Sequence, residues 1–172
     1  MTFTIGVITV SDKGAAGERK DASGPLIGDL LKDIGGIVKS YIIVPDERTE
    51  IAETIKHMCD VEKLDVIFTT GGTGFSPRDI TPEATLDVVD RLAPGISEAI
   101  RMNSLSITPK AMLSRAVSGI RKQSLIINLP GSPKGVKESL EVIIPALSHG
   151  IGILKGTAVE CGNHHHNHNH KK

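Results

Sequence analysis

Apolar residues come in blocks along the chain, and their spacing predicts strands and helices in turn. The first block, Phe3–Val10, is a short run rich in Ile and Val, which is typical of a buried strand. The polar stretch Ser11–Ser23 follows and predicts a loop. Pro25 then opens a segment with apolar residues at helical spacing, which Gly35 and Gly36 close. This part of the chain therefore predicts a strand, a loop and a helix.

The same alternation continues through the middle of the chain. Ile37–Val44 predicts a second strand, and Ile51, Ile55 and Met58 mark one face of a helix. Asp65–Thr70 predicts a third strand. Because strands alternate with helices, the expected fold class is α/β, with a mainly parallel sheet covered by helices on both faces.

The next part of the chain is less regular. Thr81 matches an N-cap, followed by proline and an acidic residue, which predicts a helix from there to about residue 91. Another helix is expected from residue 94 or 95 to about residue 104. Ser114–Ile120 carries no helical stripe and predicts an irregular segment or an antiparallel strand. Leu125–Leu129 predicts a further strand.

A last helix is expected after the segment Pro130–Pro133, and Pro145 is expected to end or kink it locally. Its apolar face consists of Val136, Leu140, Ile143, Ile144 and Leu147. We expect residues 1–156 to form one domain. Residues 157–172, which end in a His/Asn/Lys tract and lack apolar periodicity, are expected to form a flexible tail.

Composition narrows the possible functions. The chain has 172 residues, which fits one globular domain, and its 20 Lys and Arg balance its 20 Asp and Glu. With no net charge, no Trp, one Tyr and three Phe, it lacks the basic and aromatic surfaces that bind nucleic acids. No apolar run approaches the roughly 20 residues of a membrane span, and no export signal is evident, so a cytoplasmic location is expected.

Cysteine and histidine are scarce outside the tail. Cys59 and Cys161 are too few for a disulfide framework or a zinc cluster. Before the tail only His57 and His149 occur, both in predicted helices, which argues against a Ser/His/Asp hydrolase. The tail histidines could bind nickel or zinc, or the tract could be an expression remnant. They are His164, His165, His166, His168 and His170.

Loops that follow strands are the places to search for a ligand site, because ligands of open parallel sheets bind beyond the carboxyl ends of the strands. Four segments qualify: Ser11–Asp12, Val44–Asp46, Thr70–Asp79 and Asn128–Ser132. In the third, three glycines within four residues let backbone amides approach a phosphate, and the next helix adds its dipole. The pattern is neither of the two common nucleotide-binding glycine loops, so a structural turn stays a second interpretation.

Asp46 and Asp79 each follow a predicted strand, so their carboxylates could face one cleft. Such a pair could hold Mg²⁺, which prefers a few carboxylates together with water and phosphate oxygens. The other interpretation is that Asp46 caps the helix starting near Thr49 and Asp79 caps the turn before Thr81. The spacing leaves both open.

The segment Asn128–Ser132 offers a similar choice. Ser132 or Gly131 can cap the last helix with Pro133 as its first residue, and a second phosphate or a nucleotide could bind there. The basic residues that could supply positive charge, or could equally be solvated surface residues, are Arg19, Arg78 and Lys134.

The segment Thr70–Thr85 resembles the signature of a known family. Its sequence, Thr-Gly-Gly-Thr-Gly-Phe-Ser-Pro-Arg-Asp-Ile-Thr-Pro-Glu-Ala-Thr, is similar to that of the molybdopterin-binding family, which includes the bacterial Mog and MoaB proteins and the G domains of gephyrin and its plant counterpart. The resemblance extends over residues 3–156. Further matching segments are Ser11–Asp12, Ser23–Pro25, Val44–Asp46, Met112–Arg115, Gly119–Arg121 and Asn128–Pro133.

The resemblance implies a three-layer α/β/α fold, a homotrimer and molybdopterin adenylyltransferase activity in molybdenum cofactor biosynthesis. In that reaction, Mg²⁺-dependent transfer of AMP from ATP to the terminal phosphate of molybdopterin gives adenylyl-molybdopterin and pyrophosphate. It also implies handover of the product to a molybdate-insertion protein. Two alternatives are a non-catalytic molybdopterin carrier and a participant in molybdate insertion.

By motif position, the resemblance implies that Asp46 and Asp79 are the catalytic and metal-binding carboxylates. It also implies a set of loop residues that bind the two substrates. This set is Ser11, Asp12, Gly71, Gly72, Thr73, Gly74, Ser76, Asn128, Pro130, Gly131 and Ser132. A site made of amides, hydroxyls, two carboxylates and a metal suits phosphoryl chemistry, which needs little covalent help from side chains.

Overall fold

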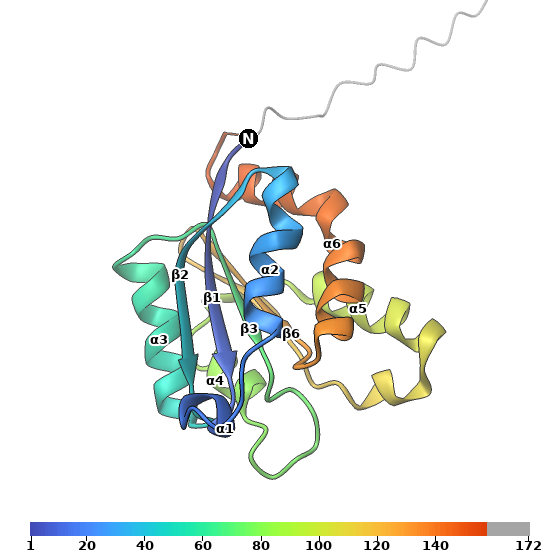
Figure 1. Ribbon diagram of the computed structural model, residues 1–172. Coiled ribbons are helices and arrows are strands. Elements are labelled where there is room, and N and C mark those ends of the chain that lie inside the picture. Colours follow the sequence, from blue (N-terminus) through green and yellow to red (C-terminus); the bar gives the residue numbers. More distant parts are fainter. Residues whose placement is uncertain (158–172) are drawn as a thin grey trace, which may run out of the picture.

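The computed structural model describes residues 1–157, which form a mixed six-stranded sheet with helices on both faces (Figure 1). The strand order is β2-β1-β3-β6-β5-β4. The first four strands in this order are parallel, whereas β5 runs antiparallel to β6 and β4 runs antiparallel to β5. The strands are β1 (Phe3–Val10), β2 (Gly36–Val44), β3 (Val66–Thr70), β4 (Arg91–Leu92), β5 (Ser118–Arg121) and β6 (Ser124–Leu129).

The helices bury two separate apolar clusters against the sheet. One face is covered by α2 (Ser23–Leu31), α5 (Pro94–Ile107) and α6 (Pro133–Leu154), and the other by α3 (Arg48–Asp60) and α4 (Thr81–Leu86). Both clusters consist almost wholly of aliphatic side chains, as the low aromatic content requires. The predicted three-layer α/β/α fold with a mainly parallel sheet is therefore confirmed.

The helix expected to run from residue 81 to about residue 91 is shorter than predicted. α4 ends at Leu86, and after a turn the chain forms the two-residue strand β4. The backbone N–H of Asp90 donates to the carbonyl of Ile120, and β4 pairs with β5. Pairing at the edge of the sheet thus replaces the last helical turns.

Other segments refine the sequence-based expectations. A short helix, α1 (Asp12–Ala15), lies within the stretch predicted as a loop. The segment Ser114–Ile120, expected to be irregular or antiparallel, contains both: residues 114–117 form no regular element, and the antiparallel strand β5 begins at Ser118. A 3₁₀ helix, η2 (Pro109–Leu113), precedes this segment. A second 3₁₀ helix, η1 (Lys32–Ile34), extends α2. α6 continues through Pro145, so the proline does not end the helix.

The parallel strands end at one edge of the sheet, and this edge positions the candidate site. Val10 of β1 pairs with Val44 of β2, and Thr70 of β3 pairs with Leu129 of β6. The loops that leave these four strands therefore emerge side by side. The predicted tail, including Cys161 and the tail histidines, lies outside the described residues apart from Thr157. Among residues 1–157, no helix has the length and apolarity to cross a bilayer.

At the amino ends of the parallel strands, Asp65 links the start of β3 to residues near both ends of the described chain. Its Oδ2 accepts hydrogen bonds from the backbone N–H and the hydroxyl of Thr4, at 2.7 and 3.0 Å, and its Oδ1 lies 2.9 Å from Nζ of Lys155. Burial raises the pKa of Asp65, but the contacts with Lys155 and Thr4 outweigh it, so the pKa lies below its ordinary value.

Asp65→Asn is expected to lower the free energy of unfolding at pH 7 by about 2 kcal/mol, because Thr4 and Lys155 lose a charged acceptor that is itself buried. Since the folded-state pKa is depressed, this contribution is present above the unfolded-state pKa of about 3.9 and is lost as the pH falls through the lower folded value. Urea unfolding should therefore show that the difference in unfolding free energy between the protein and the variant decreases as the pH falls from 7 to 2.

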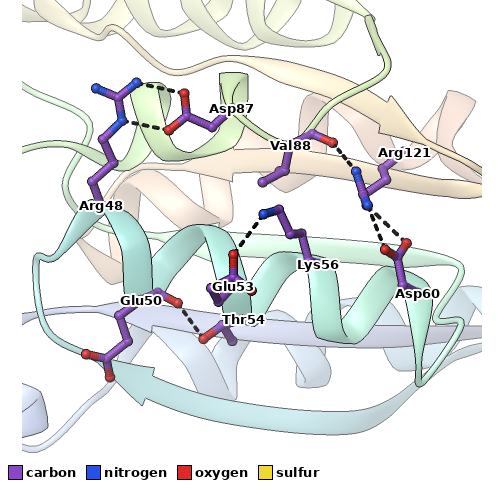
Figure 2. A network of polar contacts seen from close by, with 9 residues as sticks. All are labelled: Arg48, Glu50, Glu53, Thr54, Lys56, Asp60, Asp87, Val88 and Arg121. Carbon is purple, nitrogen blue, oxygen red and sulfur yellow. Dashed lines mark hydrogen bonds and ion pairs between the residues drawn. The ribbon is translucent and has the colours of Figure 1, made fainter.

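The matched control is Asp87→Asn. Asp87 also forms an ion pair, here a bidentate one with Nε and Nη2 of Arg48 at 2.7 Å (Figure 2). Both side chains of this pair are exposed. Exposed pairs of this kind contribute little because water and salt screen them. Equal losses in the two variants at pH 7, or a difference for Asp65→Asn that persists at pH 2, would contradict the expectation.

Candidate functional site

Two hollows open beyond the carboxyl ends of β1, β2, β3 and β6. The first has a volume of about 530 Å³ and the second about 470 Å³, and Ser132 lines both. The predicted site residues that line the first hollow are Ser11, Asp46, Gly71, Gly72, Asp79, Gly131 and Ser132. Those that line the second are Thr73, Gly74, Asn128, Pro130 and Ser132. Asp12 and Ser76 line neither hollow, although both touch residues of the first.

The glycine loop between β3 and α4 has a backbone that only glycine adopts without strain. Gly71 and Gly72 have φ angles of 103° and 65°, in the left-handed region. A Cβ at Gly71 would collide with the carbonyl oxygen of Val10, and one at Gly72 with the hydroxyl of Thr81. The same Cβ at Gly72 would lie 3.2 Å from Oδ1 of Asp46, so the loop packs directly against this carboxylate.

Thr81 fastens the glycine loop to the start of α4. Its hydroxyl donates to the carbonyl of Gly71 at 2.9 Å, and its backbone N–H donates to that of Gly72 at 3.1 Å. The expectation that Thr81 is the N-cap of this helix is wrong, because Ile80 occupies that position and the Thr81 hydroxyl is committed to the loop.

Asp79 closes the glycine loop with one of its carboxylate oxygens. Its Oδ2 accepts hydrogen bonds from the backbone N–H groups of Gly74 and Ser76, at 3.0 and 3.1 Å. No hydrogen bond from the described residues reaches its Oδ1. The sequence left capping and metal binding as alternatives for Asp79. In the structure one oxygen caps the loop, and the other is available to a ligand.

Asp46 and Asp12 hold each other in place through their backbones. The N–H of Asp12 donates to Oδ2 of Asp46 at 2.9 Å, and the N–H of Asp46 donates to Oδ1 of Asp12 at 3.0 Å. Asp46 does not cap α3, whose N-cap is Glu47 without a side-chain hydrogen bond. Its Oδ1 receives no hydrogen bond within residues 1–157 and lies beside Gly72.

Arg78 joins the glycine loop to this pair. Its Nε and Nη2 lie 3.0 and 2.9 Å from the carboxylate of Asp12, and Nη2 also lies 2.8 Å from Oε1 of Glu47. Arg78 therefore lines neither hollow, although the sequence offered it as a positive charge for an anion. Its contacts instead hold the loop beside Asp46.

The pKa values of the neighbouring residues Asp12 and Asp46 are shifted in opposite directions. The hydrogen bonds from Arg78 hold the pKa of Asp12 below its ordinary value. Burial raises the pKa of Asp46, and the like charges of Asp12 and Asp79 add to the increase. Asp46 is half-buried, and the charge of Asp79 repels its ionised form. A cation between Asp46 and Asp79 would reduce this repulsion.

The loop after β6 is held against the glycine loop. The hydroxyl of Thr70 donates to the carbonyl of Pro130 at 2.7 Å, and that of Ser23 donates to the carbonyl of Gly131 at 2.8 Å. Ser132 is the N-cap of α6 and accepts from the N–H of Gly135 at 3.1 Å, as predicted. In the same way, Ser11 caps α1 by accepting from the N–H of Gly14.

Asn128 is fully buried, and its amide is used within the protein. Its Nδ2 donates to the hydroxyls of Thr69 and Thr85, both at 2.9 Å, and its Oδ1 accepts from the N–H of Val117 at 3.2 Å. These contacts tie β6 to β3, to α4 and to the segment before β5. Asn128 thus shapes the second hollow from below the surface.

The positive charges of the two hollows come partly from residues that the sequence did not single out. Arg19 and Lys20 line the first hollow, and Arg101, Lys110 and Lys134 line the second. Of these, the sequence suggested only Arg19 and Lys134. Arg101 and Lys110 lie on α5 and η2 and follow no strand, so a search of strand ends does not find them.

The donor set of the first hollow fits a hard divalent cation. Asp46 and Asp79 each present an oxygen without a hydrogen bond, and among residues 1–157 no group of three or more His, Cys, Asp or Glu gathers for a metal. Two carboxylates without nitrogen or sulfur ligands suit Mg²⁺, which completes its shell with water and phosphate oxygens.

The fold and the site together define the class of protein. It is a three-layer α/β protein whose glycine loop and paired carboxylates meet beyond the carboxyl ends of parallel strands. Within that class, residues 6–149 match the family described as "probable molybdopterin binding domain". The chain belongs to this family.

Individual relatives agree with this assignment. The molybdopterin adenylyltransferase of Helicobacter pylori strain J99 is 43% identical over 161 residues, which cover 92% of each chain. That of Escherichia coli strain K12 is 40% identical over 156 residues, which cover 87% of this chain and 80% of the relative. The crystal structure of the molybdopterin biosynthesis enzyme MoaB from Thermus thermophilus matches with a TM-score of 0.86 and 47% identity, covering 90% of this chain and 98% of that one.

Proposed function

We propose that the protein is a molybdopterin adenylyltransferase that transfers AMP from ATP to the terminal phosphate of molybdopterin. The observation that carries the proposal is the convergence of Asp46, Asp79 and the glycine loop on the first hollow. The names of the relatives from Helicobacter pylori and Escherichia coli, at 43% and 40% identity, support it. The product would be adenylyl-molybdopterin, made within molybdenum cofactor biosynthesis.

The reaction requires two polyanions to meet. An oxygen of the molybdopterin phosphate attacks the α-phosphorus of ATP, the bond from that phosphorus to the bridging oxygen breaks, and pyrophosphate leaves. The site must therefore reduce charge repulsion and hold the reacting groups in line. Arg19 and Lys20 supply positive charge in the first hollow, and the amino terminus of α6 adds its dipole.

Two adjacent hollows suit two substrates. The glycine loop borders both, because Gly71 and Gly72 line the first and Thr73 and Gly74 line the second. The loop after β6 is in contact with it, since a Cβ on Gly131 would lie 3.3 Å from Cα of Gly71. Phosphate groups held in the two hollows would approach each other near Ser132.

Asp46 and Asp79 would hold Mg²⁺ through Oδ1 of each, the oxygen that accepts no hydrogen bond from residues 1–157. Bound Mg²⁺ supplies charge neutralisation and alignment of phosphate oxygens. The chain's own part is to fix both carboxylates: the backbone of Asp12 orients Asp46, and the amides of Gly74 and Ser76 orient Asp79. Of the other predicted binding residues, Ser11 and Ser132 bring hydroxyls to the first hollow.

We further propose that the chain acts in the cytoplasm as a homotrimer and passes its product to a molybdate-insertion protein. Exposed apolar side chains on and around α5 and η2 support burial against another subunit. They are Met102, Leu105, Ile107, Met112 and Leu113. Light scattering on the purified protein would test the trimer directly.

An enzyme and a carrier are separated by measuring binding and transfer on the same sample. The purified protein is incubated with molybdopterin, labelled ATP and Mg²⁺, and both retained pterin and labelled product are quantified. We expect pterin binding and many AMP transfers per site. Tight pterin binding without transfer, under conditions in which a family enzyme turns over, would instead indicate a carrier. Consumption of added adenylyl-molybdopterin with molybdate, but no synthesis of it, would indicate molybdate insertion.

A further inference from the structure

One side chain fastens the segment Gly74–Asp79 of the glycine loop. Arg115, which follows η2, donates from Nε to the carbonyl of Gly74 and from Nη2 to the carbonyl of Asp79, both at 2.7 Å. These two carbonyls stand at the two ends of the segment. The guanidinium therefore links the two ends of the segment, and the amides of Gly74 and Ser76 that Asp79 accepts from belong to this same segment.

Arg115 is itself held from three directions. Its Nη1 contacts Oε1 of Glu83 on α4, and its backbone N–H donates to the carbonyl of Thr73 at 2.9 Å. The neighbouring carbonyls of Ser114 and Ala116 accept from Nη1 of Arg101 on α5, at 2.9 and 3.3 Å. Contacts with α4 and α5 thus fix the position of Arg115.

The contacts of Arg115 are of a kind that only a planar fork of donors can make together. Three nitrogens reach three different acceptors, whereas a lysine ammonium is a single point at the end of a flexible stem. The side chain is 32% exposed and lines neither hollow, so it does not contact a ligand held there.

We propose that Arg115 is a positioning residue for AMP transfer, which fixes both ends of the Gly74–Asp79 segment and thereby aims the Asp79 carboxylate at the first hollow. The inference rests on the proposed function for its catalytic consequence, but its structural part, the order of the loop, can be measured without catalysis.

The test compares Arg115→Lys with a matched control, Arg121→Lys. Arg121 also pairs with a carboxylate, Asp60, and donates to a backbone carbonyl, that of Val88 (Figure 2). None of these three residues lines either hollow. Arg115→Lys is expected to lower kcat about 30–100-fold with KM for both substrates within about threefold, because misplacing a reacting group by about 1 Å can cost 10²-fold. Arg121→Lys should keep kcat and KM within about twofold of the unsubstituted protein.

Hydrogen exchange of the Gly74 and Ser76 amides provides the readout that needs no turnover. Exchange should be at least about tenfold faster in Arg115→Lys and unchanged in Arg121→Lys, since both amides depend on the Asp79 carboxylate that Arg115 positions. Unchanged exchange in Arg115→Lys overturns the inference, whether or not the protein transfers AMP. If the protein transfers no AMP but exchange accelerates as expected, the proposed function fails and the loop-ordering role stands.

Arg115→Ala, assayed with and without millimolar methylguanidinium, keeps the test decisive if the lysine variant folds poorly. Recovery of kcat and slowing of loop exchange by the added cation support positioning by a guanidinium. Activity of Arg115→Lys or Arg115→Ala equal to that of the unsubstituted protein overturns it. So does a rise in KM at constant kcat, because that pattern marks a residue that binds substrate.

Discussion

Asp46→Asn is expected to lower the rate of AMP transfer by about 10²–10³-fold, the size of effect seen when one electrostatic contact to a transition state is removed. Asparagine keeps an oxygen for the N–H of Asp12, and the backbone bond from residue 46 to Asp12 is untouched, so the fold should persist. What the substitution removes is the charge facing Asp79. Molybdopterin affinity should therefore change by less than about threefold, which equilibrium binding measurements can check.

The control for Asp46→Asn is Asp87→Asn, which removes a carboxylate charge from the surface pair with Arg48. It should leave transfer and binding as they are. Parallel losses of transfer and molybdopterin affinity in Asp46→Asn would point to a structural role for the carboxylate. Transfer at the normal rate would remove Asp46 from the reaction.

Asn128→Ala is expected to lower the free energy of unfolding by about 3 kcal/mol and the Tm by roughly 6–12 °C. The truncation leaves the buried hydroxyls of Thr69 and Thr85 and the N–H of Val117 without their partner. It also opens a cavity between β6 and α4. Calorimetry or thermal denaturation followed by circular dichroism measures the change.

Asn103→Ala is the control for this prediction, because Asn103 lies exposed on α5. Its effect should stay within about 0.5 kcal/mol. If Asn128→Ala melts at the normal temperature yet loses ligand affinity, Asn128 contacts the ligand, as its family position suggests, and its buried bonds matter little.

Most of the fold follows from apolar spacing. The buried strands β1, β3 and β6 and the helices α2, α3, α5 and α6 stand where the sequence predicts them, because each carries a continuous apolar run or a helical stripe. The end of α4 could not be predicted in this way. Pairing of Arg91 and Leu92 with β5 depends on residues that are distant in sequence, so local capping signals point to a longer helix.

The candidate site was predictable to the extent that it follows strands. Asp46, Asp79, Gly71 and Gly72 lie in loops that follow strands, and the parallel sheet brings these loops to one hollow. The capping of the loop by Asp79 was not predictable in detail, since nothing in the spacing shows which oxygen the loop amides occupy. The contacts of Arg115 with the loop were not predictable for another reason. Arg115 donates to backbone carbonyls, and every residue has one, so the sequence does not show which carbonyls it contacts.

The position of the label in the product tests the central claim most directly. The protein is supplied with molybdopterin, Mg²⁺ and ATP labelled with ³²P at either the α- or the γ-phosphate, and the pterin product is isolated. If the protein transfers AMP, α-label appears on the pterin and γ-label appears in pyrophosphate. Label from the γ-phosphate on the pterin, or no label on the pterin from either ATP, would contradict the account.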